Sequence, residues 1–273
     1  MNTVAAIQMN SGADVAANLA TARRLLQEAR AGGAVLAVLP ENFAFMGAHE
    51  TDKLAHAEPL GAGPIQSFLA AAARELGLWI VAGTLPLAAP GQSGKVLAAS
   101  LVFDDAGRCV AHYDKIHLFD VSFERDGRTE SYRESNSIAF GAVRPTLSDT
   151  PAGRLGLSVC YDLRFPELYR ALAADGARLL CVPSAFTDKT GEAHWEILLR
   201  ARAVENFCFV IAPNQSGTHA GGRRTWGHSM IVGPWGEVLA QRADGEGVVL
   251  APIDAAAQEK IRQSFPSLQH RRL

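Results

Sequence analysis

The clearest place for chemistry in this sequence is Cys160, a thiol that directly follows an apolar segment. Residues 156–160 have the character of a buried strand. Pro166 suits the first turn of a helix that carries Leu168 and Leu172 on its apolar face. Backbone N–H groups at such a strand-to-helix junction have free donor capacity, which favours the thiolate. The sequence therefore predicts either a nucleophile or, as for most free thiols, an inert buried cysteine.

A cysteine nucleophile needs a group that takes its proton, and Glu41 is the predicted acceptor. Its carboxylate comes directly after Pro40 and the continuous apolar strand expected at residues 34–39. The eight histidines have no papain-like context, and no Gly-x-Ser-x-Gly elbow occurs, so both of those hydrolase classes are disfavoured. The alternative for Glu41 is a solvated carboxylate at the end of a strand.

Two further charged residues follow predicted strands or lie in a polar segment. Lys115 ends a strand among apolar and aromatic neighbours, where an ammonium could be held in a partly dry site. The alternative is an exposed lysine, the usual fate of this residue type. Glu134 lies in a polar segment, residues 123–137, that we expect to form a long ordered loop. It is either a second carboxylate of the site or part of the loop surface.

Composition limits the classes of protein that fit. The 273 residues are 48% hydrophobic and 20% charged, with a formal net charge of −2, as in a globular protein that buries a large core. This charge favours neither nucleic acid nor an anionic membrane as a partner. The most apolar window, residues 76–90, is too short to span a bilayer, and no signal peptide is evident. Four cysteines without paired spacing predict reduced thiols in a cytoplasm.

The elements that position these residues mix βα alternation with hairpins. Asp14 can cap a helix that ends at Gly32 and Gly33, and Pro64 opens a second helix that ends at Gly77. Residues 104–107 are the turn of a hairpin. Strands are expected at residues 4–9, 34–39, 79–83, 96–103, 109–113, 156–160, 178–182, 207–212, within 226–236, 238–241 and 248–253, with further helices after Pro166 and at about 193–205.

An internal echo suggests how these elements are arranged. Gly33 and Ala34 precede Pro40 by the same spacing with which Gly176 and Ala177 precede Pro183, each time after a helix. Two related halves packed together explain the echo, and they place Glu41 and Ser184 at the same edge. We therefore predict an α/β fold of four layers, an α-β-β-α sandwich with two mixed sheets face to face. No linker divides the chain, so residues 1–273 are predicted to form a single domain.

Three sequence blocks together resemble the nitrilase superfamily of carbon–nitrogen hydrolases. Glu41 lies in LPEN, Lys115 in DKIHLFD and Cys160 in SVCYDLRFPEL, in the order of the three catalytic blocks of that superfamily. The finer text at residues 133–137, 183–205 and 227–236 is similar to the deaminated glutathione amidases of the Nit branch. The chain departs from the Nit pattern at Glu192 and in residues 214–225, which touch the rim of the site.

The resemblance implies a mechanism without a metal or an organic cofactor. Cys160 attacks an amide carbonyl, Glu41 exchanges the protons, and Lys115 faces the oxyanion together with the backbone N–H of Tyr161. Glu134 positions Lys115. The product of the first half of the reaction is a thioester acyl-enzyme, which water hydrolyses.

The Nit branch also implies a small-molecule amide with a 2-oxo-dicarboxylate acyl group, and Arg164 is the predicted partner of its carboxylate. Phe186 and Thr190 are at positions that line the acyl pocket of the family. The alternative for Arg164 is an ion pair with Glu167 or Asp162.

Other functions stay open from the sequence. An omega-amidase acting on 2-oxoglutaramate, another small-amide hydrolase of the superfamily, or a catalytically silent binding scaffold would also suit this fold. The resemblance further implies a homodimer or a higher homo-oligomer, formed through the helices after Cys160 and around residues 195–202. A role in metabolite repair follows from the Nit branch.

Overall fold

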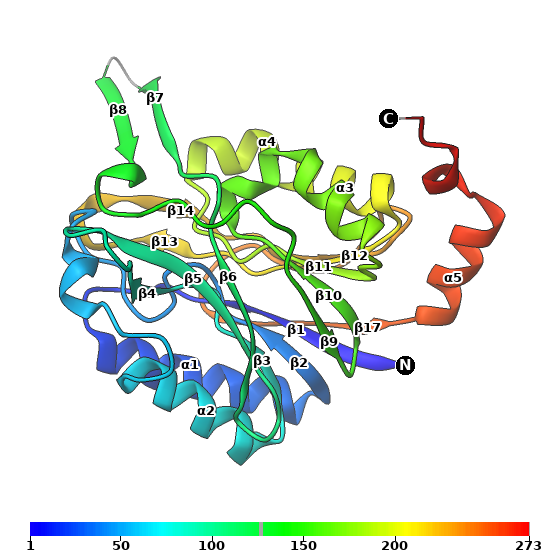
Figure 1. Ribbon diagram of the computed structural model, residues 1–273, viewed down its shortest axis with the longest axis horizontal. Coiled ribbons are helices and arrows are strands. Elements are labelled where there is room, and N and C mark those ends of the chain that lie inside the picture. The colour runs from blue at the N-terminus through cyan, green and yellow to red at the C-terminus, as the bar shows by residue number, and fades with distance from the viewer. Residues whose placement is uncertain (126–127, 273) are drawn as a thin grey trace.

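The computed structural model describes residues 1–125 and 128–272, and two large β-sheets dominate these residues (Figure 1). The first sheet has the order β17-β1-β2-β3-β5-β4, with β6 also paired to β5. Its strands are β1 (Asn2–Gln8), β2 (Ala34–Val38), β3 (Trp79–Val81), β4 (Leu85–Ala88), β5 (Val96–Phe103), β6 (Cys109–Asp114) and β17 (Gly247–Ile253). Strands β1, β2 and β3 are parallel, and the outer pairs are antiparallel.

The second sheet has the order β16-β15-β12-β11-β10-β9. Its strands are β9 (Leu147–Thr150), β10 (Gly153–Leu157), β11 (Leu179–Cys181), β12 (Phe209–Ala212), β15 (Ser229–Val232) and β16 (Val238–Arg242). Here too the central strands β10, β11 and β12 are parallel and the outer pairs antiparallel. Both sheets are therefore mixed.

Helices cover the outer faces of the two sheets (Figure 1). On one side lie α1 (Val15–Ala31) and α2 (Pro64–Leu76), and on the other α3 (Pro166–Ala174) and α4 (Asp188–Asn206). Side chains alternate along β1, so Val4 and Ala6 pack with the second sheet while Ala5 and Ile7 pack with the core beneath α1 and α2. The predicted four-layer α-β-β-α sandwich is confirmed.

Several local predictions hold because the capping groups do what their types suggest. Asp14 accepts a hydrogen bond from the Ala17 N–H at 3.1 Å and begins α1. Pro64 occupies the first turn of α2, and Gly77 ends that helix with a φ of 56°. In the hairpin between β5 and β6, Asp104 Oδ1 accepts from the N–H groups of Ala106 and Arg108 at 3.1 and 2.8 Å.

The predicted loop at residues 123–137 is instead largely a hairpin, of which residues 126–127 lie outside the described part. Strands β7 (Asp120–Arg125) and β8 (Arg128–Arg133) pair antiparallel, and the short 3₁₀ helix η2 (Glu134–Asn136) follows. Polar groups join the two strands, among them the Ser122 and Ser131 hydroxyls at 2.8 Å. In β7 the alternation of Val121 and Phe123 with Ser122 and Glu124 was a short strand signal, but β8 has no comparable apolar pattern with which to predict a hairpin.

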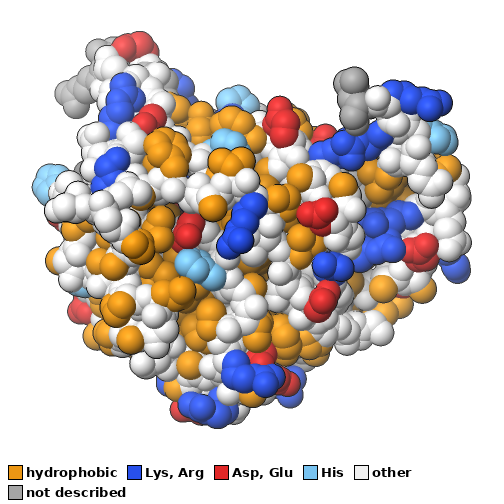
Figure 2. Space-filling model, viewed as in Figure 1, with side chains coloured by type: hydrophobic (Ala, Val, Ile, Leu, Met, Phe, Trp, Pro, Cys, Tyr) orange, Lys and Arg blue, Asp and Glu red, His pale blue; other side chains and the backbone are white. Residues whose placement is uncertain are grey.

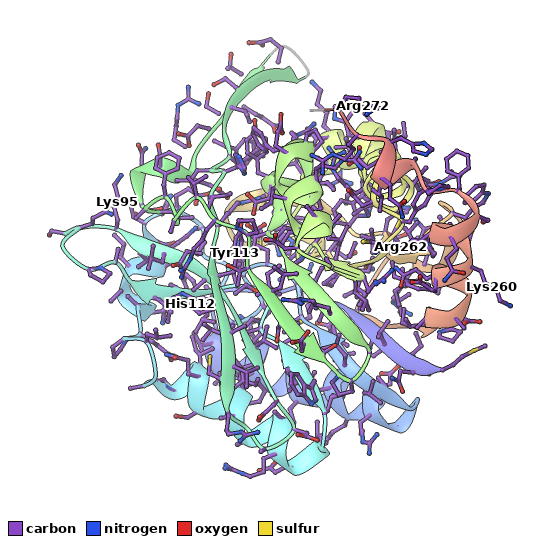
Figure 3. The ribbon with its side chains drawn as sticks, turned by 45° about the vertical axis from the view of Figure 1, so that its right-hand side comes forward. Lys95, His112, Tyr113, Lys260, Arg262 and Arg272 are labelled. Carbon is purple, nitrogen blue, oxygen red and sulfur yellow. The ribbon has the colours of Figure 1, made fainter. Side chains whose placement is uncertain are left out.

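Two helices also differ from expectation. Helix α4 begins at Asp188, five residues before the predicted start at 193. Helix α5 (Ala255–Ser264) was not predicted, although Asp254 caps it by accepting from the Ala257 N–H at 2.9 Å. Figure 3 shows Lys260 of α5 at the outer edge of the molecule. Arg262 of the same helix donates to the Ala177 and Asn206 carbonyls at 3.0 and 3.1 Å, which fixes α5 to the second sheet.

The distribution of surface charge and the length of the helices bear on which partners the protein could bind. On the face shown in Figure 2, basic and acidic side chains are interspersed with apolar ones, without a basic stripe. None of the described helices combines the length and the apolar character that crossing a lipid bilayer requires.

The predicted site residues Glu41, Lys115 and Cys160 lie just after strands of the two sheets, namely β2, β6 and β10. Residues 39–41 continue from β2 and pass closely over Gly83, which has a φ of 59°. A Cβ atom added at Gly83 would lie 2.0 Å from the Pro40 carbonyl oxygen. The backbone that carries Glu41 is therefore in direct contact with the turn after β3.

We expect Gly83→Ala to lower the free energy of unfolding by more than about 2 kcal/mol, because strain at positive φ adds to a clash with backbone. Gly77→Ala is the matched control: its φ is 56° and its added Cβ meets nothing within 4 Å. It should cost only about 1–2 kcal/mol. Urea unfolding of both variants measures the difference, and equal losses would contradict the close approach at Gly83.

Candidate active site

A buried ion cluster joins three of the predicted residues. The Lys115 ammonium donates to Glu41 Oε1 at 2.8 Å and to Glu134 Oε1 and Oε2 at 3.0 and 2.8 Å. Lys115 is 0% exposed, Glu41 3% and Glu134 6%. The alternatives of an exposed lysine and a solvated strand-end glutamate are therefore wrong, and Glu134 is no part of the loop surface.

Backbone N–H groups complete the partners of the two carboxylates. Glu41 Oε2 accepts from the Ala185 N–H at 2.9 Å, and Glu134 Oε2 accepts from the Phe119 N–H at 2.8 Å. Ala185 follows β11 in the second sheet, whereas Glu41 follows β2 in the first. The echo predicted that these two strand ends share an edge, and this hydrogen bond joins them.

The cluster keeps its ionised form. Burial alone would lower the pKa of Lys115, but the carboxylates of Glu134 and Glu41 outweigh it and hold that pKa well above the ordinary value. Burial likewise acts to raise the pKa of Glu134, and the ammonium groups of Lys115 and Lys53 more than reverse this, so the pKa is lowered. Lys115 is thus a permanent cation near neutral pH.

Cys160 sits in a tight turn beside this cluster. It begins the 3₁₀ helix η3 (Cys160–Arg164), has a φ of 47° and is 8% exposed. Such a positive φ is strained for a residue with a Cβ atom. The Cys160 N–H donates to the Pro183 carbonyl at 2.9 Å, which ties the turn to the end of β11.

The thiol of Cys160 is not held as a thiolate, which corrects the expectation from the strand-to-helix junction. Burial and the negative charges of Glu41 and Glu134 raise its pKa well above the ordinary value. The Lys115 ammonium and hydrogen bonding from the Ala185 backbone act the other way but are outweighed. Cys160 therefore rests as a thiol and needs a base.

Asp162 holds the turn that carries Cys160. Its buried carboxylate accepts from the Val159 N–H at 2.8 Å, the Tyr113 hydroxyl at 2.7 Å and the His117 N–H at 3.1 Å. His117 also contacts it through Nδ1 at 2.7 Å and stacks on Phe165 at 3.6 Å between ring centroids. Burial and Asp162 raise the pKa of Tyr113, so its hydroxyl stays a donor. Tyr113, labelled in Figure 3, is 2% exposed and therefore buried.

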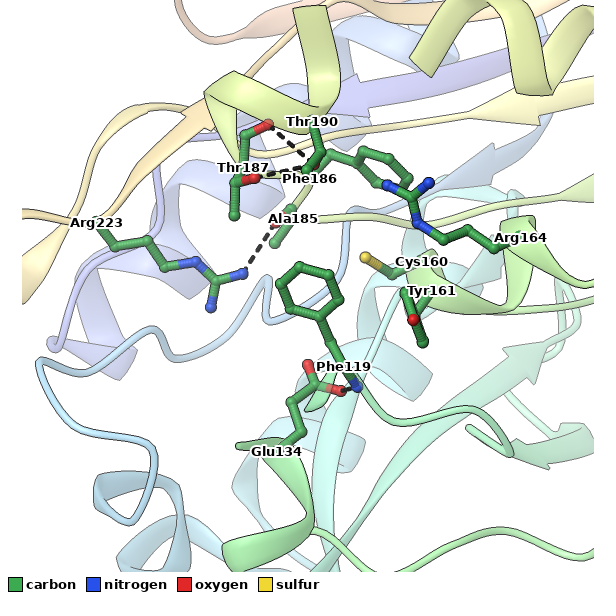
Figure 4. Close-up of a pocket in the computed structure, with 10 residues that line it drawn as sticks. All are labelled: Phe119, Glu134, Cys160, Tyr161, Arg164, Ala185, Phe186, Thr187, Thr190 and Arg223. Carbon is green, nitrogen blue, oxygen red and sulfur yellow. Dashed lines mark hydrogen bonds between the residues drawn. The ribbon is translucent and has the colours of Figure 1, made fainter. Parts of the chain in front are cut away.

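A pocket opens in front of Cys160 (Figure 4). Six of the predicted residues line it, namely Glu134, Cys160, Tyr161, Arg164, Phe186 and Thr190. Four lining residues were not predicted: Phe119, Ala185, Thr187 and Arg223. Glu41 and Lys115 are absent from the lining, since they lie buried behind it.

Arg164 is available to a ligand in this pocket. Among the described residues it forms no ion pair with Asp162 or Glu167, so that alternative is wrong. Its guanidinium lies over the rings of Tyr161 and Phe186, 5.8 and 5.6 Å from their centroids, and contacts His194 Nδ1 at 3.3 Å.

Residues of the segment after β12 support the site and were not predicted. Gln215 Nε2 donates to the Glu41 carbonyl at 3.0 Å, and Asn214 Oδ1 accepts from the Phe186 N–H at 3.0 Å. Arg223 Nη2 donates to the Ala185 carbonyl at 3.0 Å. Polar residues directly after an apolar strand were a usable signal for Asn214 and Gln215, but Arg223 had none.

This arrangement can perform acyl transfer. A thiol, a carboxylate that can take its proton and a fixed ammonium that can face an oxyanion converge on one pocket. The thiol interacts electrostatically with Glu41, Lys115 and Glu134, so all four groups belong to one site.

Comparison with known proteins shows which family and which relatives this chain is similar to. The family model for carbon–nitrogen hydrolases matches residues 3–263. A relative, the deaminated glutathione amidase of Yersinia enterocolitica, is 43% identical over 270 residues, which cover 98% of this chain and 92% of the relative.

Two solved structures are also similar. Nit3 of Saccharomyces cerevisiae, described as a member of branch 10 of the nitrilase superfamily, is 31% identical with a TM-score of 0.87, covering 100% of this chain and 97% of Nit3. A mutant amidase from Nesterenkonia sp. AN1 is 28% identical with a TM-score of 0.79, covering 98% of this chain and 99% of the amidase. In that structure acrylamide has added to the active-site cysteine.

We expect Glu41→Gln to lower the pKa of Cys160, because the substitution removes a negative charge that disfavours the thiolate. Iodoacetamide labelling of Cys160 at pH 7 should accelerate by about tenfold or more, and its pH profile should move to lower pH. Mass spectrometry of the labelled peptide measures both. Glu167→Gln, which alters an exposed carboxylate in α3, is the control and should leave the profile unchanged. Slower labelling of Glu41→Gln at every pH would contradict this account.

Proposed function

The chain belongs to the carbon–nitrogen hydrolase family of the nitrilase superfamily, and we propose that it hydrolyses deaminated glutathione to 2-oxoglutarate and Cys-Gly. It is a cysteine amidase. The observation that supports this chemistry is the buried Lys115 between Glu41 and Glu134, in the same site as the thiol of Cys160, a residue whose backbone φ is positive. The substrate is proposed from relatives such as the Yersinia enzyme, and Arg164 in the pocket supports it.

The proposed reaction begins with Cys160 as a thiol. Glu41 takes the thiol proton as sulfur forms a bond to the amide carbon, and the carbonyl becomes an oxyanion. Lys115 and the backbone N–H of Tyr161 stabilise this oxyanion, and the loss of one such donor in other enzymes costs about 3–4 kcal/mol of barrier. Since the pKa of Lys115 is raised, it acts as a fixed charge and not as a proton donor.

Collapse of the tetrahedral intermediate breaks the carbon–nitrogen bond. Glu41 returns its proton to the leaving amine, and the acyl group stays on Cys160 as a thioester. Glu41 then takes a proton from water, whose oxygen attacks the thioester carbon. The carboxylic acid leaves and the proton returns to sulfur, so one water is consumed for each amide bond broken.

The acyl side of the pocket suits a 2-oxo-dicarboxylate. A guanidinium binds a carboxylate through two parallel hydrogen bonds, and Arg164 presents one beside the rings of Tyr161 and Phe186. Thr190 adds a hydroxyl to the lining. Glu134 holds Lys115 with both carboxylate oxygens and so acts as a positioning residue.

We also propose the setting in which the enzyme works. Residues 1–273 act as a single domain, which the match over residues 3–263 supports. The enzyme forms a homodimer through α3 and α4, because Ile197 and Val204 of α4 are 70% and 44% exposed. Its four cysteines are free, which suits the cytoplasm, and its role is metabolite repair.

A substrate panel tests the function. The wild type should release Cys-Gly from deaminated glutathione with a kcat/KM at least about 100-fold above that for ammonia release from 2-oxoglutaramate. Cys160→Ala should lose hydrolysis of both substrates, because no nucleophile remains. Faster use of 2-oxoglutaramate would assign the enzyme to omega-amidase, and no reaction with any amide despite a titratable Cys160 would indicate a binding scaffold.

Arg164→Ala tests the acyl pocket separately. We expect KM for deaminated glutathione to rise by about 10- to 100-fold, the effect of losing a charge-assisted contact to a carboxylate. The rate of Cys160 labelling by iodoacetamide should change little, because the main groups that set the pKa of the thiol are Glu41, Lys115 and Glu134 and do not include Arg164. An equal loss of labelling would mean that Arg164 supports the turn and does not bind substrate.

A further inference from the structure

Arg223 lies where the active-site pocket meets two further cavities. It lines the pocket that contains Cys160, and it is the residue which that pocket shares with a second cavity. That cavity is also lined by Asn42, residues 45–50, Lys53, residues 131–132 and Ala220. It also lines a third cavity, with residues 130–132, Asp188 and residues 221–224. A group bound near Cys160 that extends into either of these cavities therefore passes this side chain.

The segment that carries Arg223 is built as a fixed support. The His219 N–H donates to the Arg223 carbonyl at 2.8 Å. The buried His219 ring contacts the Ser11 carbonyl at 2.9 Å and the Thr225 hydroxyl at 2.7 Å. Burial lowers the pKa of His219, so it holds these contacts as a neutral ring. Arg223 thus has a defined place beside the pocket.

The guanidinium of Arg223 has donor capacity to spare. Nη2 donates to the Ala185 carbonyl at 3.0 Å. Nη1 lies 3.7 Å from Glu50 Oε1, beyond hydrogen-bond distance. Nε is buried and has no hydrogen-bond partner among the residues described. An unpaired buried donor is costly, so a ligand that accepts from this guanidinium would gain free energy on binding.

Arg223 and Arg164 reach into the pocket from opposite sides, with Cys160 between them in the view of Figure 4. An amide whose acyl carboxylate is bound by Arg164 must direct its leaving amine away from Arg164. That direction leads toward Arg223. The leaving amine and not the acyl group therefore meets this second guanidinium.

The cavity beyond Arg223 has room for one more negative charge. Its walls carry the cations Lys53 and Arg223 but only one carboxylate, Glu50. Lys53 Nζ donates to Glu50 Oε2 at 3.0 Å, so this single carboxylate is shared between both cations. An extended dipeptide spans about 7 Å, which lets its terminal carboxylate lie well away from the scissile amide.

We propose that Arg223 binds a carboxylate on the leaving amine and so makes this enzyme select amides of acidic, peptide-like amines. The inference rests on the proposed amidase function and assigns the leaving-group half of that same site. It gives one residue of the segment 214–225, Arg223, a role in specificity. Ammonia as a leaving group would make no use of Arg223.

The competing explanation is that Arg223 only offsets buried charge. Glu50, Glu41 and Glu134 act to raise the pKa of Arg223 against its burial, so it is electrostatically coupled to the catalytic cluster. On that account its loss would slow every substrate by the same factor and shift the labelling profile of Cys160. A preference between two matched leaving groups separates the two roles.

The experiment compares deaminated glutathione with an analogue whose terminal glycine carboxylate is a neutral carboxamide. Both substrates contain the same scissile amide. For the wild type we expect kcat/KM to favour the acid by about 10- to 100-fold, mainly through KM. In Arg223→Gln this preference should fall to within about threefold, and Arg223→Lys should keep part of it because the charge remains.

Arg224→Gln is the matched control, because it removes the same charge from the next residue, whose side chain is 62% exposed. It should keep the wild-type preference. A wild type that cleaves both substrates equally, or an Arg223→Gln variant that loses the same factor on both, overturns the inference and leaves the amidase function standing. A wild type that cleaves neither overturns the proposed function, and the inference with it. Active-site titration of Cys160 in each variant ensures that only folded enzyme is counted.

Discussion

The hydrogen-bonded burial of Lys115 between Glu41 and Glu134 is the interaction on which the rest of this site depends. An ammonium with 0% exposure is costly unless carboxylates and good geometry compensate for its desolvation. Three contacts of 2.8–3.0 Å do so here. Two carboxylates against one ammonium leave a net negative charge beside Cys160. Burial and the two carboxylates of this cluster therefore raise the pKa of the thiol, so the proposed attack by Cys160 needs a base.

The fold provides this cluster by bringing strand ends from its two halves, one for each large sheet, to one edge. Glu41 follows β2 and Ala185 follows β11, and the hydrogen bond between them joins the two sheets at 2.9 Å. One half supplies the carboxylate and the other supplies a backbone donor. The turn at Cys160 is tied to the same place, since its N–H donates to the Pro183 carbonyl. The packing of the four layers thus fixes the backbone atoms that surround the Cys160 sulfur.

The sequence was most informative where chemistry coincides with the end of an apolar strand. Glu41, Lys115 and Cys160 each follow such a segment, which made them candidates, and the resemblance of their three sequence blocks to the nitrilase superfamily predicted that they converge. The protonation state of the thiol could not be predicted, because it depends on the charges of Glu41, Lys115 and Glu134, which lie 26 to 119 positions before Cys160 in the chain. The φ of 47° at Cys160 could not be predicted either, because the residue is not a glycine, the usual sequence signal for a positive φ. Arg223 could not be identified from the sequence, because its proposed role follows from its place between three cavities and not from the residues next to it in the chain.

The charge arrangement explains how one lysine can serve both the resting site and the proposed reaction. At rest the thiol is neutral, and Glu41, Glu134 and Lys115 together carry a net charge of −1. When sulfur attacks, its proton moves to Glu41 while the negative charge moves to the oxyanion, so the net charge stays −1. No charge has to be created in a dry site, which keeps the cost of reorganisation small. The ammonium has three N–H donors, and its contact with Glu41 Oε1 weakens once that carboxyl is protonated. A donor is thereby released at the step in which the oxyanion forms, and Glu134, which keeps two contacts to Lys115, holds the cation in place throughout.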